Sequence, residues 1–358
     1  MNLERLHLDK TLLYALFAMA TISLFVVYSA SARDMDATLG HLLRLCLGFT
    51  VLLVVAQIRP EFLERWSPYL FIAGMLLLVA VLALGVIGKG AQRWLDLGVL
   101  RFQPAEIMKI AVPMMLAWYL ARKNLPPSLP RLAAAFLMMA VPAFMIIKQP
   151  DLGTALLVFG AGVFVLFLSG MQWRVILTLL AIVAVAAPFA WNHLHDYQRQ
   201  RIFTLFDPEA DPLGTGYHTI QSMIAVGSGG IYGKGWLNSS QAHLDYLPES
   251  STDFIFAVFA EEFGLIGSLL LVLIYTLIVA RGMLIAYLAK DSYTRLLAGS
   301  LSLTFFLYFF VNMGMVTGIL PIVGIPLPMM SYGGTSIVTV MAAFGILMSI
   351  QTHRKIAE

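Results

Sequence analysis

The sequence TLLYALFAMATISLFVVY, from Thr11 to Tyr28, contains no charged residue. An apolar run of this length is long enough to cross a bilayer as an α-helix. It is longer than the apolar segment of a secretory signal peptide, and similar runs follow it along the chain. We therefore predict that this run is the first of a series of transmembrane helices.

The composition of the whole chain supports this interpretation. Of its 358 residues, 59% are hydrophobic and only 12% are charged, whereas a soluble domain carries about a quarter charged residues. A soluble fold is therefore excluded. Backbone polar groups in lipid must be satisfied internally, and the apolar runs lack strand-like alternation. We predict an all-α, polytopic integral membrane protein. The single cysteine, Cys46, allows no intrachain disulfide.

We predict about ten transmembrane helices, within a single transmembrane domain that covers residues 1–358. The apolar segment 317–331 is not among them, because Pro321, Pro326 and Pro328 interrupt it and proline breaks helices. We expect that segment to be re-entrant or a loop. The predicted spans are 11–30, 41–58, 68–87, 104–121, 131–147, 152–169, 174–191, 253–280, 295–316 and 332–350.

Lysine and arginine are concentrated in the loops on one side of these spans, as is typical of cytoplasmic loops. We expect that side to be cytoplasmic, with both termini inside. The loop 192–252 then lies outside, between the seventh and eighth spans. It contains RIFTLF and TIQSMIAV, which we expect to lie on the membrane surface as amphipathic helices. The cations on the cytoplasmic side are Arg5, Lys10, Arg59, Arg65, Arg122, Lys123, Arg131, Arg174, Arg281, Lys290, Arg295, Arg354 and Lys355.

Charged residues within the spans are candidates for function, because a charge in the membrane is costly unless it is paired or hydrated. Glu106 and Lys109 lie three residues apart at the start of the fourth span, on one helix face. They form either a functional site or a structural ion pair that fixes helix packing. Lys148 and Asp151 lie in the outer turn before the sixth span, which Asp151 is expected to cap.

The outer loop 88–103 carries Lys89, Arg93 and Arg101 on the side of the membrane that usually holds few cations. Two explanations remain open. These residues bind an anionic ligand, or they are attracted to lipid phosphates.

The sequence PESSTDFIFAVFAEEFG, from Pro248 to Gly264, places a carboxylate where the long outer loop enters the eighth span. Asp253 and the two residues before it are all suitable helix N-caps, so Asp253 is either a cap or a catalytic group. Glu261 follows about 12 Å further along a helix and points within about 80° of Asp253. We expect Glu261 to face the same cavity as Asp253, and Glu262 to face a neighbouring helix.

Two other motifs do not support a function. GSGGIYGKG, residues 227–235, lacks the first glycine and the final Ser or Thr of a phosphate-binding loop, so we reject nucleotide binding. Its glycines are expected to allow turns or a close approach of the backbone. NHLHD, residues 192–196, offers His193, His195 and Asp196 without the spacing of a metal site.

The segment from Asn312 to Ser336, NMGMVTGILPIVGIPLPMMSYGGTS, closely resembles the signature of the SEDS family, the shape, elongation, division and sporulation proteins. The resemblance covers essentially the whole chain and is closer to the RodA-like elongation branch than to the FtsW-like division branch. RodA-like relatives often have His two positions before Asp253, where this chain has Ser251. A role of that histidine in proton transfer or metal binding therefore does not carry over. Other matching segments are GAQRWLDLG (90–98), RFQPAEIMKI (101–110), KQPDLGTA (148–155) and LPESSTDFIFAVFAEEFG (247–264).

The resemblance implies a peptidoglycan glycosyltransferase that polymerises lipid II at the outer face of the bacterial plasma membrane. The family's essential acidic residue matches Asp253, which we expect to act as general base on the acceptor sugar hydroxyl. Outer-face cations would stabilise the pyrophosphate leaving group. The expected substrate-binding residues are Arg93, Arg101, Gln103, Glu106, Lys109, Lys148 and Asp151, and the expected supporting residues are Glu261, Glu262, Ser331, Gly333 and Gly334.

The resemblance also implies partners. These are lipid II and the nascent glycan strand, a class B penicillin-binding protein and the elongation machinery, with membrane lipid around them and no nucleic acid. A divalent cation, Mg or Mn, is an alternative source of positive charge for the leaving group, with Asp253 or Asp151 as ligand. The sequence does not identify a metal site.

The alternative function is a lipid II transporter, or flippase. Transporters often contain internal repeats with broken helices in matching positions. The proline-interrupted segment 317–331 has no counterpart in the first half of the chain, which favours an enzyme. A third alternative is a structural scaffold, which would not need Asp253.

Overall fold

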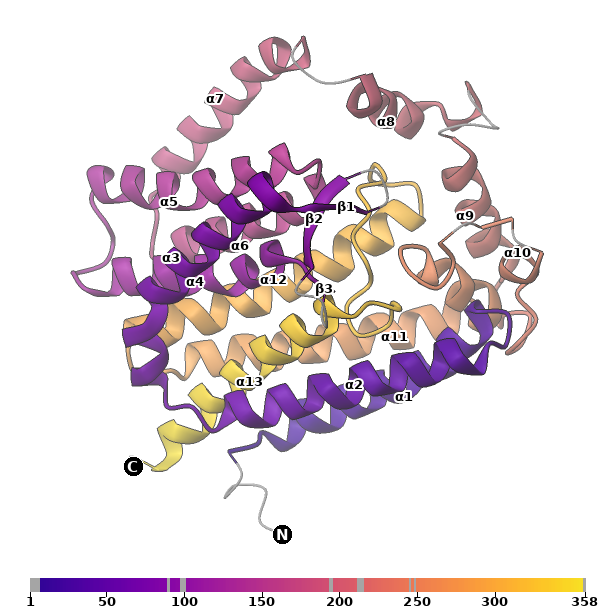
Figure 1. The fold of residues 1–358 in the computed structure, drawn as a ribbon, viewed down its shortest axis with the longest axis horizontal. Helices are drawn as coiled ribbons and strands as arrows, with labels where there is room; N and C mark the ends of the chain where they lie inside the picture. Colours follow the sequence, from indigo (N-terminus) through magenta and orange to yellow (C-terminus); the bar gives the residue numbers. More distant parts are fainter. Residues whose placement is uncertain are drawn as a thin grey trace.

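The computed structural model describes residues 7–88, 91–96, 101–192, 196–210, 216–244, 246–247 and 249–356. These residues form a bundle of long helices, and the first helix begins on the same side of it as the last helix ends (Figure 1). The elements are α1 (Lys10–Ala30), α2 (Met35–Ala56), α3 (Pro60–Leu84), β1 (Val86–Gly88), β2 (Ala91–Asp96), β3 (Arg101–Phe102), α4 (Pro104–Ala121), α5 (Leu129–Lys148), α6 (Leu152–Leu168), α7 (Trp173–Trp191), α8 (Asp196–Phe206), the 3₁₀ helix η2 (Pro208–Ala210), α9 (Tyr217–Ser228), α10 (Ser240–His243), α11 (Ile255–Tyr287), α12 (Ser292–Val316) and α13 (Thr335–Ile356).

The long helices have the length and composition of membrane spans. Among the described residues, α1, α2, α3, α5, α11, α12 and α13 are each long and apolar enough to cross a bilayer, and α6 and α7 are shorter apolar helices. Large apolar side chains such as Leu43 and Leu76 are exposed, at 70% and 66% of their surface, as expected where a protein faces lipid. The chain is therefore a multi-pass helical membrane protein.

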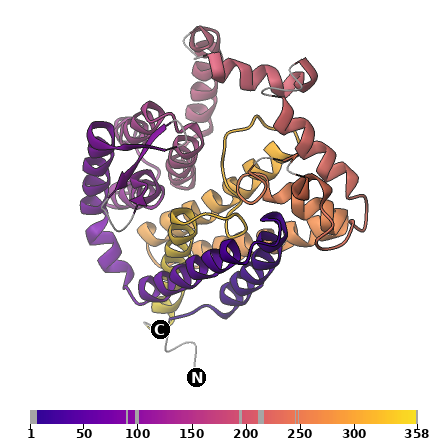
Figure 2. The ribbon, with the colours of Figure 1, turned by 45° about the vertical axis from the view of Figure 1, so that its right-hand side comes forward.

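Helix α12 lies at the centre of the bundle and packs against α4, α6 and α11. In its most apolar window 72% of the residues are buried, compared with 22% in α3. Helix α13 lies along α2, and α1 lies along α11 (Figure 2). The central position of α12 brings its C-terminal end, which carries Asn312, next to the start of α11.

Each predicted span coincides with a helix, but the boundaries differ. Helix α2 begins at Met35 rather than at 41, α3 at Pro60 rather than at 68, and α11 continues to Tyr287 rather than ending at 280. The prediction for 317–331 is confirmed in its local structure, because no regular helix joins α12 to α13. Much of this irregular segment is nevertheless buried, including Met330 and Ser331.

A small antiparallel sheet, in the order β1-β2-β3, follows α3. The predicted spans are all helices, and these short strands lie between the third and fourth of them. Strand β1 has three residues and β3 has two, too few for an apolar alternation to be visible in the sequence. The sheet packs near the ends of α3 and α4 and so positions Arg93 on β2.

The loop 192–252 is largely helical where it is described. Helices α7 and α8 form an arch that leads to α9 (Figure 1). RIFTLF forms the end of α8 and TIQSMIAV lies within α9, so both segments are helical as predicted, and their place on the membrane surface stays a prediction. Gly229 and Gly233 contact the backbone of α11 so closely that a Cβ atom at either position would collide with it. These glycines therefore permit close backbone packing between the loop and α11.

Candidate functional site

Asp253 lies in a turn immediately before α11. The helix begins at Ile255, and its N-cap position is occupied by Phe254, which makes no side-chain cap hydrogen bond. The interpretation of Asp253 as the N-cap residue was therefore wrong, because the helix begins later than the sequence signal indicates. Asp253 is partly buried, at the point where the outer loop joins a transmembrane helix.

The Asp253 turn is fixed by three residues of the 312–336 segment. The Asn312 Nδ2 atom donates a hydrogen bond to the backbone oxygen of Asp253 at 2.8 Å. Ser331 Oγ donates to the backbone oxygen of Thr252 at 2.6 Å. The backbone nitrogen of Tyr332 donates to the backbone oxygen of Ser251 at 2.8 Å. Three consecutive carbonyl groups are thus bound by residues far away in the sequence.

Gly324 approaches the carboxylate itself. A Cβ atom at this position would lie 3.4 Å from Asp253 Oδ2, so the segment between α12 and α13 passes directly beside the acid. The φ angle of Gly324 is +69°, a conformation that favours glycine. The 312–336 segment therefore both holds the Asp253 backbone and lines its side chain.

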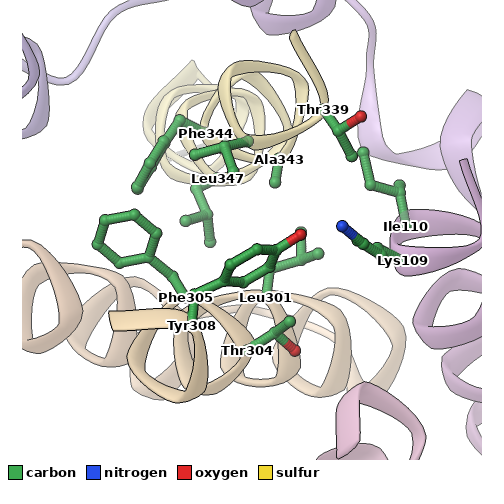
Figure 3. Close-up of a pocket in the computed structure, with 11 residues that line it drawn as sticks. Lys109, Ile110, Leu301, Thr304, Phe305, Tyr308, Thr339, Ala343, Phe344 and Leu347 are labelled. Atoms are coloured by element: carbon green, nitrogen blue, oxygen red, sulfur yellow. The ribbon is translucent and has the colours of Figure 1, made fainter. Parts of the chain in front are cut away.

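Glu106 and Lys109 form a buried ion pair, with 2.5 Å between Lys109 Nζ and Glu106 Oε1. The ammonium group also lies 4.9 Å above the Tyr308 ring of α12, and it points toward that ring from α4 in Figure 3. Glu106 Oε2 is buried without a hydrogen-bond partner in the described part of the chain. A small cavity of about 30 Å³ lies beside Lys109 and Tyr308, which is room for about one water molecule.

Asp151 joins two of the predicted substrate-binding residues. Gln103 Nε2 donates to Asp151 Oδ2 at 2.7 Å, and Arg93 Nε lies 3.8 Å from the same oxygen. The other oxygen, Oδ1, accepts from the backbone nitrogen of Thr154 at 3.1 Å, so the prediction that Asp151 caps the sixth span is confirmed. Arg93 also donates to the backbone oxygens of Gln149 and Pro150. Both carboxylate oxygens of Asp151 are thus occupied.

Lys148 is not joined to this cluster by any contact among the described residues. Lys148 is exposed at the end of α5, with its ammonium group 5.4 Å from the Phe144 ring centroid. The backbone of Arg101 forms β3, while its side chain and Lys89 lie outside what the structure describes. His193 and His195 also lie outside the described residues.

Glu261 anchors the outer loop. Its fully buried carboxylate accepts a hydrogen bond from Lys234 Nζ at 2.6 Å, one from Ser239 Oγ at 2.5 Å and one from Ser240 Oγ at 2.7 Å. The expectation that Glu261 faces the Asp253 cavity was wrong. Helix geometry predicts the direction of the Glu261 side chain relative to Asp253. It does not predict that residues 234–240 of the outer loop cover that face of the helix.

Glu262 points to the other side of α11, as predicted. It accepts hydrogen bonds from Ser29 Oγ of α1 and from the backbone nitrogen of Leu237, the latter at 3.1 Å. It therefore connects α1, α11 and the outer loop. The two carboxylates together fasten residues 234–240 to the start of α11.

The described residues contain no cluster of three or more His, Cys, Asp or Glu side chains that could hold a metal ion. Asp151 does not suit a metal ligand, because its two oxygens are already bound by Gln103, Arg93 and the backbone of Thr154.

Comparisons with known proteins agree with this geometry. A family model described as cell cycle protein, for FtsW, RodA and SpoVE, matches residues 9–356. The chain belongs to the SEDS family. It is 52% identical over 353 residues to the peptidoglycan glycosyltransferase MrdB of Escherichia coli strain K12, covering 98% of this chain and 95% of that protein. It is 37% identical to MrdB of Helicobacter pylori strain J99, covering 98% and 92%.

Solved structures of this SEDS family share the fold. One, described as "Structural coordination of polymerization and crosslinking by a peptidoglycan synthase complex", has a TM-score of 0.85 at 31% identity and covers 97% of this chain and 98% of that chain. A crystal structure of the Thermus thermophilus rod shape determining protein RodA has a TM-score of 0.73 at 26% identity and covers 97% of both chains.

One charged residue of this SEDS protein was missed in the sequence. Arg44 lies inside the predicted span 41–58, and its guanidinium group lies 4.0 Å from the Tyr332 ring centroid. The signal was available, because an arginine within a transmembrane run indicates a functional position.

Proposed function

We propose that this SEDS-family chain is a peptidoglycan glycosyltransferase that polymerises lipid II, with Asp253 as the general base. The names of its relatives support the reaction: MrdB of E. coli is called a peptidoglycan glycosyltransferase, at 52% identity over nearly the full length. The single observation that carries the assignment of Asp253 is the set of hydrogen bonds from Asn312, Ser331 and Tyr332 to its turn. The three contacts immobilise the backbone of one acid at the membrane edge.

The proposed chemistry needs a base that is held firmly. The acceptor sugar hydroxyl attacks the anomeric carbon of the donor, the bond from that carbon to the pyrophosphate oxygen breaks, and undecaprenyl pyrophosphate leaves. Asp253 takes the proton of the attacking hydroxyl. Fixing the backbone on both sides of a catalytic side chain reduces the cost of orienting it during the reaction.

The buried polar residues around α4 form the proposed wall of the substrate site. Lys109 is paired with Glu106, and Arg93 with Asp151. These two cations therefore hold the lining of the site in place more than they supply net positive charge. Gln103, Lys148 and Arg101 belong to the same proposal. Glu261, Glu262, Ser331, Gly333 and Gly334 support the loop and the Asp253 turn.

The proposed topology has ten spans, both termini in the cytoplasm, and the helical loop 192–252 outside. Helix α1 begins on the same side of the bundle as α13 ends, which fits an even number of spans (Figure 1). In this arrangement the lipid tail of the substrate remains in the bilayer while its sugars react at the outer surface. The proposed location is the plasma membrane of a bacterium, and the domain covers residues 1–358.

The proposed partner is a class B penicillin-binding protein of the elongation machinery. This proposal rests on the similarity of the chain to a solved peptidoglycan synthase complex in which polymerization and crosslinking are coordinated. A crosslinking enzyme at the outer surface would receive the glycan strand as it leaves Asp253.

Purified full-length protein in detergent, supplied with lipid II, tests the function. A glycosyltransferase produces glycan strands with no membrane to cross, whereas a lipid II transporter produces none under these conditions. The product is measured as polymer on a gel, with the partner protein added in a parallel sample. Absence of polymer in both samples would contradict the proposal.

A further inference from the structure

Arg44 is a cation within α2, and among the described residues it has no carboxylate partner. It follows Met35, the first residue of α2, by nine positions, which places it about 14 Å along the helix axis. No acidic side chain in the described part of the chain forms an ion pair with it, and its Nη1 atom is buried without a hydrogen-bond partner there. An unpaired charge at this depth is costly unless a ligand compensates it.

The Arg44 guanidinium group lies beside the glycine turn that precedes α13. Its guanidinium group rests on the Tyr332 ring and lies beside Gly334, where a Cβ atom would be 3.7 Å from Arg44 Nε. Gly333 and Gly334 place no side chain over the group. Helix α13 begins at Thr335, and the first backbone N–H groups of a helix have no partner within the helix and favour negative charge.

We infer that Arg44 and the turn formed by Gly333 and Gly334 bind the pyrophosphate group of the lipid-linked substrate. The inference rests on the proposed function and deepens it. Tyr332, which carries the guanidinium on its ring, donates its backbone N–H to Ser251, two residues before Asp253. Tyr332 therefore links the proposed anion site to the turn that carries the proposed base.

Three other cations, among those that the structure describes, have carboxylate partners of their own. Arg93 is bound to Asp151, Lys109 to Glu106, and Lys234 to Glu261. Each pair is locally close to neutral. Arginine also suits the ligand, because its planar group donates two parallel hydrogen bonds to phosphate oxygens.

A purely structural role for Arg44 is the competing explanation. In that case the guanidinium stabilises Tyr332 by cation–π contact, and no ligand is needed. The two explanations differ in whether an external anion compensates the positive charge of Arg44. A carboxylate introduced beside Arg44 supplies an internal partner for it, and therefore competes with an external anion only if such an anion binds there.

The test measures thermal unfolding of the full-length protein in detergent during a titration with inorganic pyrophosphate. A ligand that binds the folded state raises the unfolding temperature. We expect Arg44→Gln to raise the apparent Kd for pyrophosphate by about tenfold or more. Gly334→Asp is expected to abolish the rise in unfolding temperature with pyrophosphate. Without ligand, this variant is expected to be as stable as wild type. It therefore tests the anion site even if Arg44→Gln does not fold.

Two controls separate the specific site from general effects. Arg33→Gln removes an exposed cation just before α2 and is expected to leave the Kd unchanged. Tyr332→Leu removes the ring under the guanidinium and is expected to retain the pyrophosphate response. An equal response in wild type and Gly334→Asp, or a response lost equally in Arg33→Gln, would overturn the inference. So would an Arg44-dependent response to phosphatidylglycerol together with none to pyrophosphate.

This measurement requires no polymerisation, so it fails independently of the proposed function. Protein that binds pyrophosphate through Arg44 but makes no glycan strands retains the anion site and contradicts the glycosyltransferase proposal. If wild type and Arg44→Gln polymerise lipid II with the same KM, that result contradicts the anion site but not the glycosyltransferase proposal.

Discussion

Asn312, near the end of α12, donates one hydrogen bond to the backbone oxygen of Asp253 at 2.8 Å and another to that of Ile325 at 2.7 Å. One buried amide thus joins the turn before α11 to the irregular segment before α13. That segment brings Gly324 beside the Asp253 carboxylate. The position of the proposed base therefore depends on a residue 59 positions away in the sequence.

Replacing Asn312 with Leu is expected to lower both stability and activity. The change leaves two buried carbonyl groups unpaired, at a cost of about 1–3 kcal/mol each, and it frees the Asp253 turn. Thermal unfolding and lipid II polymerisation of the purified protein measure the two effects. Asn124→Leu, at an exposed position, serves as the control. An Asn312→Leu protein with wild-type activity would show that this hydrogen bond does not position Asp253.

The buried pair of Glu106 and Lys109 is expected to show strong coupling. Lys109→Met or Glu106→Gln alone leaves an unpaired buried group, and breaking such a pair costs about 3–5 kcal/mol. The double variant is expected to lose much less than the sum of the single changes. A double-mutant cycle by thermal unfolding measures the coupling. If Lys109→Met is as stable as wild type but inactive, the pair binds substrate and does not mainly fix helix packing.

Glu261 is expected to control the attachment of the outer loop. Glu261→Ala removes the acceptor shared by Lys234, Ser239 and Ser240, so residues 234–240 should detach and become sensitive to protease. Limited proteolysis of the detergent-solubilised protein detects the cut. Glu262→Gln is the matched comparison and should be milder, because Glu262 Oε2 has no partner among the described residues. Equal protection of wild type and Glu261→Ala would contradict this role.

His218 gives a prediction for pH. Its ring stacks on Phe254, the residue after Asp253, and burial lowers the pKa of its imidazole below the ordinary 6.5 although Glu249 opposes the shift. The unfolded chain therefore binds this proton more readily. The contribution of His218 to stability is constant above pH 6.5 and falls as the pH drops through the lower, folded pKa.

Replacing His218 with Gln should weaken that pH dependence. We expect the fall in unfolding temperature between about pH 7 and pH 5 to be smaller in His218→Gln than in wild type. Comparing the two proteins removes the contribution of all other titrating groups. Parallel curves for wild type and variant would show that His218 is not buried in this way.

The helices of this fold could be predicted because each depends mainly on the residues of its own segment. An apolar run such as 11–28 has few alternatives in lipid, and the prolines at 321, 326 and 328 mark the break between α12 and α13. The pair of Glu106 and Lys109 and the Asp151 cap were also visible, since their partners lie three residues away.

The remaining features depend on contacts that local patterns do not contain. The SSTD sequence has every property of a helix start, yet the helix begins later because Asn312, Ser331 and Tyr332 hold the backbone of 251–253. Similarly, the helical angle of Glu261 is correct for an isolated helix but does not reveal the loop that covers it. The strands β1 and β3 are shorter than any periodicity that a sequence can show.

The most direct test of the central claim is the rate of glycan polymerisation by Asp253→Asn, measured with purified protein and lipid II. Asn has nearly the same shape as Asp but cannot accept the proton. Asp291→Asn is the matched control, because Asp291 caps α12 by accepting from the backbone of Thr294 at 2.8 Å, and Asn caps helices as well as Asp does. We predict no polymer from Asp253→Asn at wild-type folding stability, and normal polymer from Asp291→Asn. Wild-type polymerisation by Asp253→Asn would contradict the assignment of Asp253 as the general base.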